Sequence, residues 1–365
     1  MNEGMPVTGD SAVAGESGTV DEGSGMMRAW QIAELGEPLE VMSLVETQAP
    51  SVTPGHALVH VAATALNFPD VLMARGHYQV QARLPYVPGV EVCGRVVAIG
   101  AGAGGGHDAV RVGDRVVGMP ALPHGGLAEW TLIPHAAVFP APDSLDDAEA
   151  AAFTIAYQTA YVGLVRRARL QTGQTLLVHA ASGGVGSAAV QVGKALGATV
   201  VAVVGSAGKV SAATESGADH VVDRSAGDLV SMVKEIVGPA GVDVVFDPVG
   251  GSAYDASTKV VAFEGCIIVV GFAGGTISSP ALSHALVKNY SIVGLHWGLY
   301  LQRNPAVAQE AHAALSAWAA DGHIKPLVSQ RLPFEDAADG LTRLGAGQTT
   351  GRVVVLAPTP TPTPT

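Results

Sequence analysis

The fold of this chain is decided by residues 175–205, TLLVHAASGGVGSAAVQVGKALGATVVAVVG. Thr175–His179 is a short apolar run that predicts a strand, and Ala180–Gly186 interrupts it with three glycines. From Val185 the apolar residues fall at helical spacing until a glycine ends the helix. Thr199–Val204 is a β-branched run typical of a strand buried in a parallel sheet. The stretch therefore predicts a strand–turn–helix–strand unit.

A unit of this kind binds anions. The free N–H groups at the helix start and the positive end of the helix dipole hold a pyrophosphate, and glycine lets the backbone approach it closely. The predicted phosphate-binding residues are Ser182, Gly183, Gly184, Val185 and Gly186. The first glycine of the G-x-G-x-x-G pattern is replaced by Ala181, so a tight turn without a ligand is the alternative.

Composition restricts the class of protein. The 365 residues are enough for about two domains of ~100–200 residues each. A hydrophobic content of 48% with 14% charged residues permits a large core and excludes global disorder. The net charge of −12, without a basic run, argues against nucleic acid or an anionic membrane as partner. The two cysteines, Cys93 and Cys266, form no C-x-x-C motif, which favours a reducing cytoplasm over a disulfide scaffold.

The two ends of the chain are compositionally distinct. Residues 1–25 are rich in Gly, Ser and acidic side chains and lack the basic and apolar regions of a signal peptide, which predicts a disordered extension. Residues 358–365 are a Pro-Thr repeat that cannot join a helix or a sheet. No uninterrupted apolar run reaches the ~18 residues of a membrane span.

The chain changes character near its middle. From residue 26 to Pro140, short β runs separated by Gly and Pro predict a small, mostly β barrel or sandwich. Ala148–Leu164 has an alanine-rich helical pattern, and Asp146 with Glu149 forms a capping box in front of it. The composition shifts within this helix, so we predict a domain boundary near Phe153.

Beyond Phe153, strands and helices alternate, which predicts a doubly wound parallel sheet with helices on both faces. The predicted strands after the first unit are His220–Asp223, Val242–Asp247, Cys266–Val270 and Ser291–Leu295. The predicted helices are Lys209–Ser216, Asp228–Val237, Ala253–Ala262 and Pro305–Ala320. A terminal strand within Gln348–Leu356 is expected to return to the β domain.

The end of the second strand of the unit indicates the cofactor. In dinucleotide folds an acid stands there when the adenosine ribose has a free 2′-OH. Here Gly205 is followed by Ser206 and Lys209, and Arg224 follows the next strand. A hydroxyl and two cations suit a 2′-phosphate, so these residues predict NADPH rather than NADH. A lysine and an arginine that are merely solvated are the alternative.

Other strand ends supply further candidate cofactor contacts, because an open α/β sheet binds its ligand at the carboxyl ends of its strands. These candidates are Asp247, Val249, Gly271, Phe272 and Ala273. For Asp247, a role as a strand-end cap is the alternative.

Several motifs in combination resemble one family. AASGGVGSAAVQVGKALGA occurs with NFPDVLMARGHYQ (Asn67–Gln79), LPYVPGVEVCGRVVAIG (Leu84–Gly100), VGDRVVG (Val112–Gly118) and VKNYSIVG (Val287–Gly294). Over residues 26 to 356 the chain thus resembles the zinc-independent NADPH:quinone oxidoreductases of the medium-chain dehydrogenase/reductase superfamily. The resemblance implies an α/β protein with a GroES-like β-barrel domain (26–152 and 293–357) interrupted by a Rossmann domain (153–292). It also implies a homodimer or tetramer that reduces quinones or other α,β-unsaturated carbonyls with NADPH.

The zinc-dependent relatives differ at two motifs. They carry Cys-x-x-Asp and Gly-His-Glu, where this chain reads Asn67-Phe-Pro-Asp70 and Gly89-Val90-Glu91. Because the thiolate and the imidazole are both missing, no metal site is predicted. Direct hydride transfer to an easily polarised acceptor is the chemistry that fits.

The resemblance also implies catalytic residues. Asn67 is expected to face the nicotinamide or the acceptor oxygen, to which an amide can donate a hydrogen bond. An Asx-turn role before Pro69 is the alternative. Tyr78 matches a tyrosine that donates a proton or contacts substrate in enoyl-thioester reductases, although those enzymes have Asn where this chain has Leu72. The leading hypothesis is an NADPH-dependent quinone or enone reductase, and the alternatives are an acyl-CoA (2-enoyl-thioester) reductase and a catalytically silent NADPH-binding protein.

Overall fold

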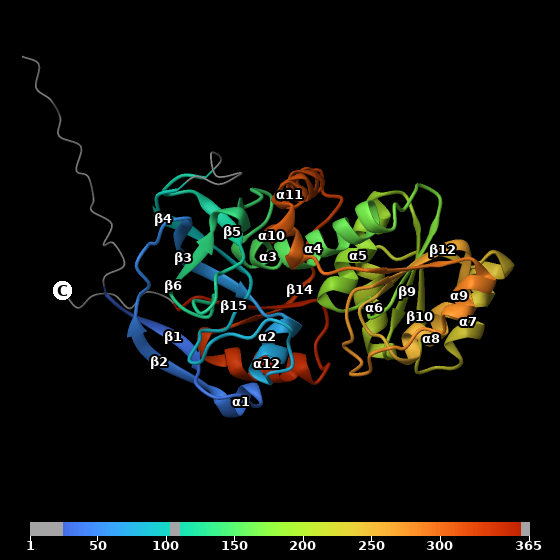
Figure 1. Ribbon diagram of the computed structural model, residues 1–365, viewed down its shortest axis with the longest axis horizontal. Coiled ribbons are helices and arrows are strands. Elements are labelled where there is room, and N and C mark those ends of the chain that lie inside the picture. Colours follow the sequence, from blue (N-terminus) through green and yellow to red (C-terminus); the bar gives the residue numbers. More distant parts are fainter. Residues whose placement is uncertain (1–24, 103–109, 359–365) are drawn as a thin grey trace, which may run out of the picture.

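The structure is a computed structural model that describes residues 25–102 and 110–358. Except for their innermost residues, the predicted N-terminal extension and Pro-Thr tail lie outside the described ranges. Figure 1 shows a β-rich lobe, built from the blue and cyan N-terminal part and the red C-terminal part, beside an α/β lobe coloured green to orange. Within the described residues, no helix has the length and apolarity needed to cross a bilayer.

The α/β lobe contains a six-stranded parallel sheet with the strand order β10-β9-β8-β11-β12-β13. Its strands are β8 (Thr175–Val178), β9 (Thr199–Val204), β10 (His220–Asp223), β11 (Val242–Asp247), β12 (Val261–Val269) and β13 (Ser291–Gly294). The chain enters at β8 in the middle, runs outward to β10 and then returns to build the other half from β11. This order is that of a doubly wound dinucleotide-binding sheet, and the predicted fold class is confirmed.

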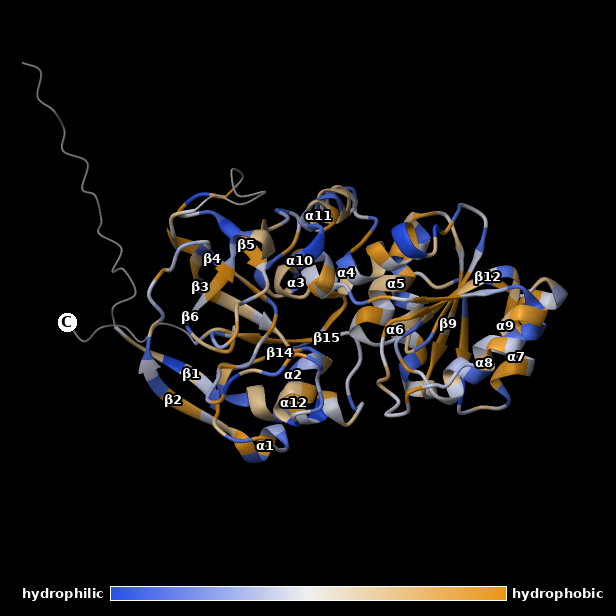
Figure 2. Cartoon of the chain, viewed as in Figure 1, coloured by the Kyte–Doolittle hydropathy of each residue, from blue (hydrophilic) through white to orange (hydrophobic). Residues whose placement is uncertain are grey.

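Helices cover both faces of this sheet because its strands are apolar on both sides. In β9, Val200, Ala202 and Val204 join one buried cluster, whereas Val201 and Val203 join another. The first cluster includes α5 (Gly184–Ala195) and α6 (Val210–Glu215), and the second includes α7 (Leu229–Val237) and α8 (Ser252–Val260). Figure 2 shows the resulting hydrophobic strands in orange between the helical layers.

The β-rich lobe is a seven-stranded sheet with the order β14-β15-β3-β4-β5-β7, and β6 pairs with β3. Its strands are β3 (His56–Ala65), β4 (Val92–Ile99), β5 (Arg115–Gly118), β6 (Trp130–Pro134), β7 (Val138–Pro140), β14 (Val328–Leu332) and β15 (Arg352–Leu356). A separate ribbon pairs β1 (Met26–Ile32) with β2 (Met42–Gln48). The C-terminal β15 lies antiparallel to β3, so the predicted return of the terminal strand is confirmed, although it begins at Arg352.

Helices complete the β-rich lobe and its junction with the sheet. Three pack in the β-rich lobe: α1 (Pro38–Val41), α2 (Phe68–Ala74) and α12 (Ala337–Gly345). At the junction lie α10 (Gly298–Arg303) and α11 (Pro305–Ala320), and the latter has the predicted bounds. The domain boundary near Phe153 stays a prediction.

The predicted helix Ala148–Leu164 is interrupted. It consists of α3 (Asp147–Ala151), α4 (Thr154–Tyr161) and a π-helical segment, η3 (Val162–Arg167). The predicted capping box is present, with Glu149 N donating to Asp146 Oδ1 at 2.9 Å and Asp146 N donating to Glu149 Oε2 at 3.1 Å. The interruption leaves Ile155 N free to donate to Glu91 Oε1 at 2.6 Å. The spacing of apolar residues in the sequence cannot reveal a tertiary hydrogen bond of this kind.

Candidate functional site

The glycine turn joins β8 to α5. Gly183 is the N-cap of α5, Gly184 is its first residue, and Ser182 is 3% exposed. A Cβ at Gly186 would lie 2.1 Å from the carbonyl oxygen of Ala180, so only glycine fits there. The five predicted phosphate-binding residues therefore span the turn and the first three residues of a 12-residue helix, where the first N–H groups have no intrahelical partner. This geometry suits an anion.

The residues predicted to bind a 2′-phosphate surround the carboxyl end of β9. Ser206 precedes a short 3₁₀ turn, η4 (Ala207–Lys209). The ammonium of Lys209 donates to the carbonyl of Gly347 at 2.8 Å. Arg224 lies beside Gly205, because a Cβ on that glycine would be 3.8 Å from Arg224 Nε. The fold thus brings a hydroxyl-bearing residue and two cations to one strand end. Neither cation forms a salt bridge with an acid of the described residues.

Asp247 is the last residue of β11 and is 1% exposed. Its Oδ1 accepts hydrogen bonds from Val249 N at 2.8 Å and from Gly250 N at 3.0 Å. The carboxylate thus caps the turn after the strand, as the alternative interpretation has it, and it points at its own backbone. Contact of Asp247 or Val249 with a cofactor stays a prediction.

The segment Gly271–Ala273 follows β12 and runs beside the turn after β11. Ala273 N donates to Pro248 O at 3.0 Å, and a Cβ at Gly250 would lie 2.8 Å from the ring of Phe272. Phe272 is 39% exposed. The carboxyl ends of neighbouring parallel strands thus form one continuous edge, as the prediction for these residues requires.

Asn67 is the N-cap of α2 and is 4% exposed. Its Nδ2 donates to Ala65 O and to Glu91 Oε2, both at 3.0 Å. Its Oδ1 accepts from Arg352 Nη1 at 2.9 Å. Both amide hydrogens are therefore used within the protein. The predicted donation from Asn67 to an acceptor oxygen stays a prediction, and it needs one of these hydrogen bonds to break.

A buried ion pair holds Asn67. Arg352 Nη2 donates to Glu91 Oε2 at 2.5 Å, and the two side chains are 6% and 0% exposed. Burial raises the pKa of Glu91, while the Arg352 guanidinium and the Asn67 amide act in the opposite direction. Sequence reasoning missed both residues. Glu91 was considered only as part of an altered zinc motif, and the signal at Arg352 is an arginine at the head of three valines.

Arg352 also touches the glycine turn. A Cβ at Gly184 would lie 2.8 Å from both Cδ and Nη1 of Arg352. The residue before it, Gly351, donates its N–H to Ser182 O at 2.7 Å. The start of β15 thus connects Asn67 of the β-rich lobe with the predicted phosphate-binding turn of the α/β lobe.

Asp70 contacts Asn67, and Tyr78 lies within reach of the charge of Asp70. Asp70 is fully buried and accepts from Asn67 N at 3.0 Å and Gly89 N at 2.9 Å. Burial raises the pKa of Asp70 to about 7. Tyr78 is half-buried against the apolar cluster around Leu66, and burial followed by the charge of Asp70 raises its pKa. A raised pKa makes the Tyr78 hydroxyl a weaker acid, so proton donation by Tyr78 stays a prediction.

The positions of the zinc ligands in related enzymes are filled by non-ligands. Asn67 and Val90 stand where the cysteine and the histidine would be. Across residues 25–102 and 110–358, no group of three or more His, Cys, Asp or Glu side chains is arranged to hold a metal ion.

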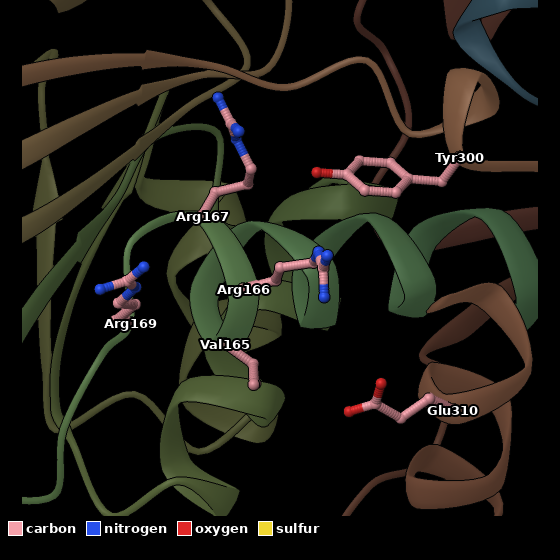
Figure 3. A pocket seen from close by; sticks show the side chains of 6 residues that line it. All are labelled: Val165, Arg166, Arg167, Arg169, Tyr300 and Glu310. Carbon is pink, nitrogen blue, oxygen red and sulfur yellow. The ribbon is translucent and has the colours of Figure 1, made fainter. Parts of the chain in front are cut away.

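A cavity of about 560 Å³ lies away from all of these residues. It is lined by Val165, Arg166, Arg167, Arg169, Tyr300 and Glu310, which come from η3, the segment after it, α10 and α11. Figure 3 shows Arg166 extending toward Tyr300 and Glu310, while Arg169 points the other way. The Arg166 guanidinium carbon is 6.0 Å from the centre of the Tyr300 ring. Because the arginines diverge and none of the predicted site residues lines this cavity, it is not the candidate site.

Comparison with known proteins identifies relatives of both lobes. The alcohol dehydrogenase GroES-like domain matches residues 53–143, and the zinc-binding dehydrogenase domain matches residues 184–316. Quinone oxidoreductase-like protein 2 of Bos taurus is 37% identical over 329 residues, which are 90% of this chain and 92% of that protein. Quinone oxidoreductase of Homo sapiens is 31% identical over 92% of this chain and 99% of its own length.

Solved structures agree with these sequence relatives. The crystal structure of Escherichia coli quinone oxidoreductase complexed with NADPH has a TM-score of 0.81 to this chain, at 29% identity, over 90% of this chain and 100% of that one. The matched zinc-binding dehydrogenase region starts at residue 184 within the glycine turn. It therefore does not include Asn67 or Val90, and its name carries no information about a metal here.

Proposed function

Since this chain belongs to the zinc-independent quinone oxidoreductases of the medium-chain dehydrogenase/reductase superfamily, we propose that it transfers a hydride from NADPH to a quinone or another α,β-unsaturated carbonyl. One observation carries the proposal. Asn67, the side chain that replaces the zinc-binding cysteine, is hydrogen-bonded to Arg352, and Arg352 itself lies against Gly184 of the glycine turn. NADPH, when bound, supplies the hydride, so the task of the protein is to bind and orient.

The residues present fit this cofactor. The first residues of α5, from Gly184 to Gly186, offer the N–H groups of a helix start to its phosphates, whereas the N–H of Gly183 is taken by Ala180 O at 2.9 Å. Ser206, Lys209 and Arg224 offer a hydroxyl and two positive charges to its 2′-phosphate, with no acid at the end of β9 to repel it. Contacts from the edge formed by Asp247, Val249 and Gly271–Ala273 are part of the same proposal.

The nature of the acceptor follows from the side chains around Asn67. An amide and a valine replace the thiolate and the imidazole, so this set offers no Lewis acid to a substrate carbonyl. The acceptor must then stabilise its own negative charge after hydride addition. Quinones and enones do so by conjugation, whereas simple ketones do not.

A steady-state assay of the purified protein tests this proposal. NADPH consumption is followed with benzoquinone, naphthoquinone, a simple enone and crotonyl-CoA. We expect turnover with quinones or the enone, and a lower KM for NADPH than for NADH. Activity on the thioester alone would indicate an acyl-CoA reductase, and tight NADPH binding without turnover a silent binding protein. Stoichiometric metal in elemental analysis would contradict the metal-free mechanism.

We also infer a cytoplasmic homodimer. Cys93 and Cys266 are free, buried thiols, as expected in a reducing compartment. Three exposed apolar side chains lie on α9 (Leu282–Lys288), the helix that contacts β12 and directly precedes β13, the edge strand of the parallel sheet: Leu282, Leu286 and Val287. We propose that a second copy of this chain covers this apolar surface, since most soluble oligomers are symmetric homo-oligomers.

A further inference from the structure

We infer that Glu91 and Arg352 are positioning residues that hold the Asn67 amide in one orientation, so that Asn67 meets a bound ligand as a hydrogen-bond acceptor and not as a donor. The inference rests on the proposed function for the position of Asn67 in the site, and it reverses the role expected for this side chain. It follows from the hydrogen-bond capacity of three buried side chains.

The donors of Asn67 are fully used. A primary amide has two N–H hydrogens and an oxygen with two lone pairs. One hydrogen goes to Ala65 O and the other to Glu91 Oε2, each at 3.0 Å. The oxygen accepts one hydrogen bond, from Arg352 Nη1 at 2.9 Å. The N–H of Asp70 also faces this side chain in the capping box of α2, but it donates to the backbone carbonyl of Asn67 at 3.0 Å. One lone pair of Oδ1 is therefore the polar capacity of the amide that remains for a ligand.

The orientation is fixed by charge. Rotating the amide by half a turn would place its oxygen against the carboxylate of Glu91 and its NH₂ against the guanidinium of Arg352. Both contacts would be repulsive, and they would lie in a buried region where electrostatic interactions are strong. The carboxylate is in turn held by Ile155 N at 2.6 Å and by Arg352, so neither partner can turn away easily.

This arrangement determines which hydride acceptors suit the site. Hydride addition to a quinone gives a hydroquinone anion, which then takes one proton from water. With both Asn67 hydrogens engaged, the amide gives no hydrogen bond to that developing oxyanion. The site therefore favours hydride acceptors whose reduced anion is already delocalised. The Oδ1 lone pair instead suits an N–H or O–H group of the bound ligand.

A double-mutant cycle tests the positioning role. Arg352→Lys keeps the charge but cannot donate to Asn67 and Glu91 at fixed angles. We expect kcat for naphthoquinone reduction at saturating NADPH to fall about tenfold, as for loss of an oriented contact. A change in KM for NADPH reports the separate contact of Arg352 with Gly184. In the Asn67→Ala background, the same substitution should change kcat less than about twofold, because its target is gone.

Arg331→Lys is the matched control for this cycle. Arg331 also pairs with a carboxylate, Asp146, but it is 44% exposed and lies on β14. We expect this variant to behave as the wild type. If the effects of Arg352→Lys and Asn67→Ala multiply, or if Arg352→Lys lowers only the thermal midpoint, Arg352 does not act through Asn67.

A second readout needs no turnover. In a protein with isotopically labelled asparagine, the Asn67 side-chain NH₂ resonances are assigned by their loss in Asn67→Ala. We expect these hydrogens to exchange with water far more slowly than those of the exposed Asn304, and Glu91→Gln to accelerate the exchange at least tenfold. Exchange as fast as that of Asn304 in the wild type would overturn the inference. Absence of turnover with every acceptor, combined with slow exchange, would reject the proposed function alone.

Discussion

Arg352 contacts residues of both lobes. A buried guanidinium is costly unless it is paired, and breaking such a pair typically costs about 3–5 kcal/mol. Here the contacting residues come from distant parts of the chain: Glu91 precedes β4, Asn67 is the N-cap of α2, and Gly184 begins α5. The charge therefore contributes to the relative placement of the amide and the glycine turn, and not only to local stability.

Lys209 is expected to select the cofactor. Lys209→Ala should raise the Kd for NADPH by about tenfold or more, because charge-assisted hydrogen bonds contribute about 1.5–3 kcal/mol. Loss of its contact with Gly347 should affect NADPH and NADH equally, so the difference between the two cofactors isolates the phosphate. Fluorescence titration with both cofactors measures this, with Lys234→Ala on α7 as the control. Equal weakening of both cofactors would remove Lys209 from the phosphate site.

Asp70 is expected to make stability depend on pH. A carboxyl whose folded-state pKa is raised stabilises the fold fully below its unfolded pKa of about 3.9, and this contribution is lost as pH rises through the folded value of about 7. Asp70→Asn does not titrate. The difference in unfolding free energy between wild type and variant should therefore fall by roughly 2–3 kcal/mol from about pH 5 to pH 8. Urea unfolding at several pH values checks this, and parallel profiles would contradict the raised pKa.

At the scale of single elements, local pattern predicted well where an element is determined by its own residues. The predicted bounds of β10 and β11 match because each is a short apolar or β-branched run between turn residues, and α11 begins at a proline after a polar segment. Prediction failed where a residue far away in the sequence determines the bounds of an element. The gap between α3 and α4 serves the Ile155–Glu91 hydrogen bond, and β12 begins at Val261 because that residue pairs with Val242 of β11.

The glycine turn allows a test at the scale of one element. Gly186→Ala should destabilise the protein by about 1–3 kcal/mol, because the new Cβ would overlap the Ala180 carbonyl and force the start of α5 to move. It should also weaken NADPH binding. Gly227→Ala is the matched control, since a Cβ there would meet only the sulfur of Met232, at an ordinary contact distance of 3.8 Å. Chemical unfolding and NADPH titration of both variants decide the matter, and equal behaviour would mean that the turn tolerates a side chain.

At the scale of the whole molecule, the sequence predicted the two-lobed fold but only part of the candidate site. The glycine turn and the β9 end are contiguous motifs, so local chemistry was enough to find them. The ion pair that holds Asn67 was not found, because Arg352 is 285 positions from Asn67 and 261 from Glu91 along the chain. A single sequence gives no sign that these three meet, since each looks ordinary within its own element.

The exposed apolar side chains of α9 are expected to form the dimer interface. Leu286 and Val287 are each 77% exposed and Leu282 is 74% exposed, all on α9, which contacts β12 and directly precedes the edge strand β13. Exposed apolar surface next to an unpaired edge is unfavourable in a monomer, whereas a two-fold contact of about 1,000 Å² or more would cover it. Leu286→Asp places a charge in that contact and should convert the dimer into a folded monomer of half the mass, as measured by light scattering after gel filtration. Leu39→Asp on α1, where the leucine is 61% exposed on the other lobe, should remain dimeric. A Leu286→Asp protein that keeps the mass of the wild type would place the interface elsewhere, and a wild-type monomer would reject the dimer itself.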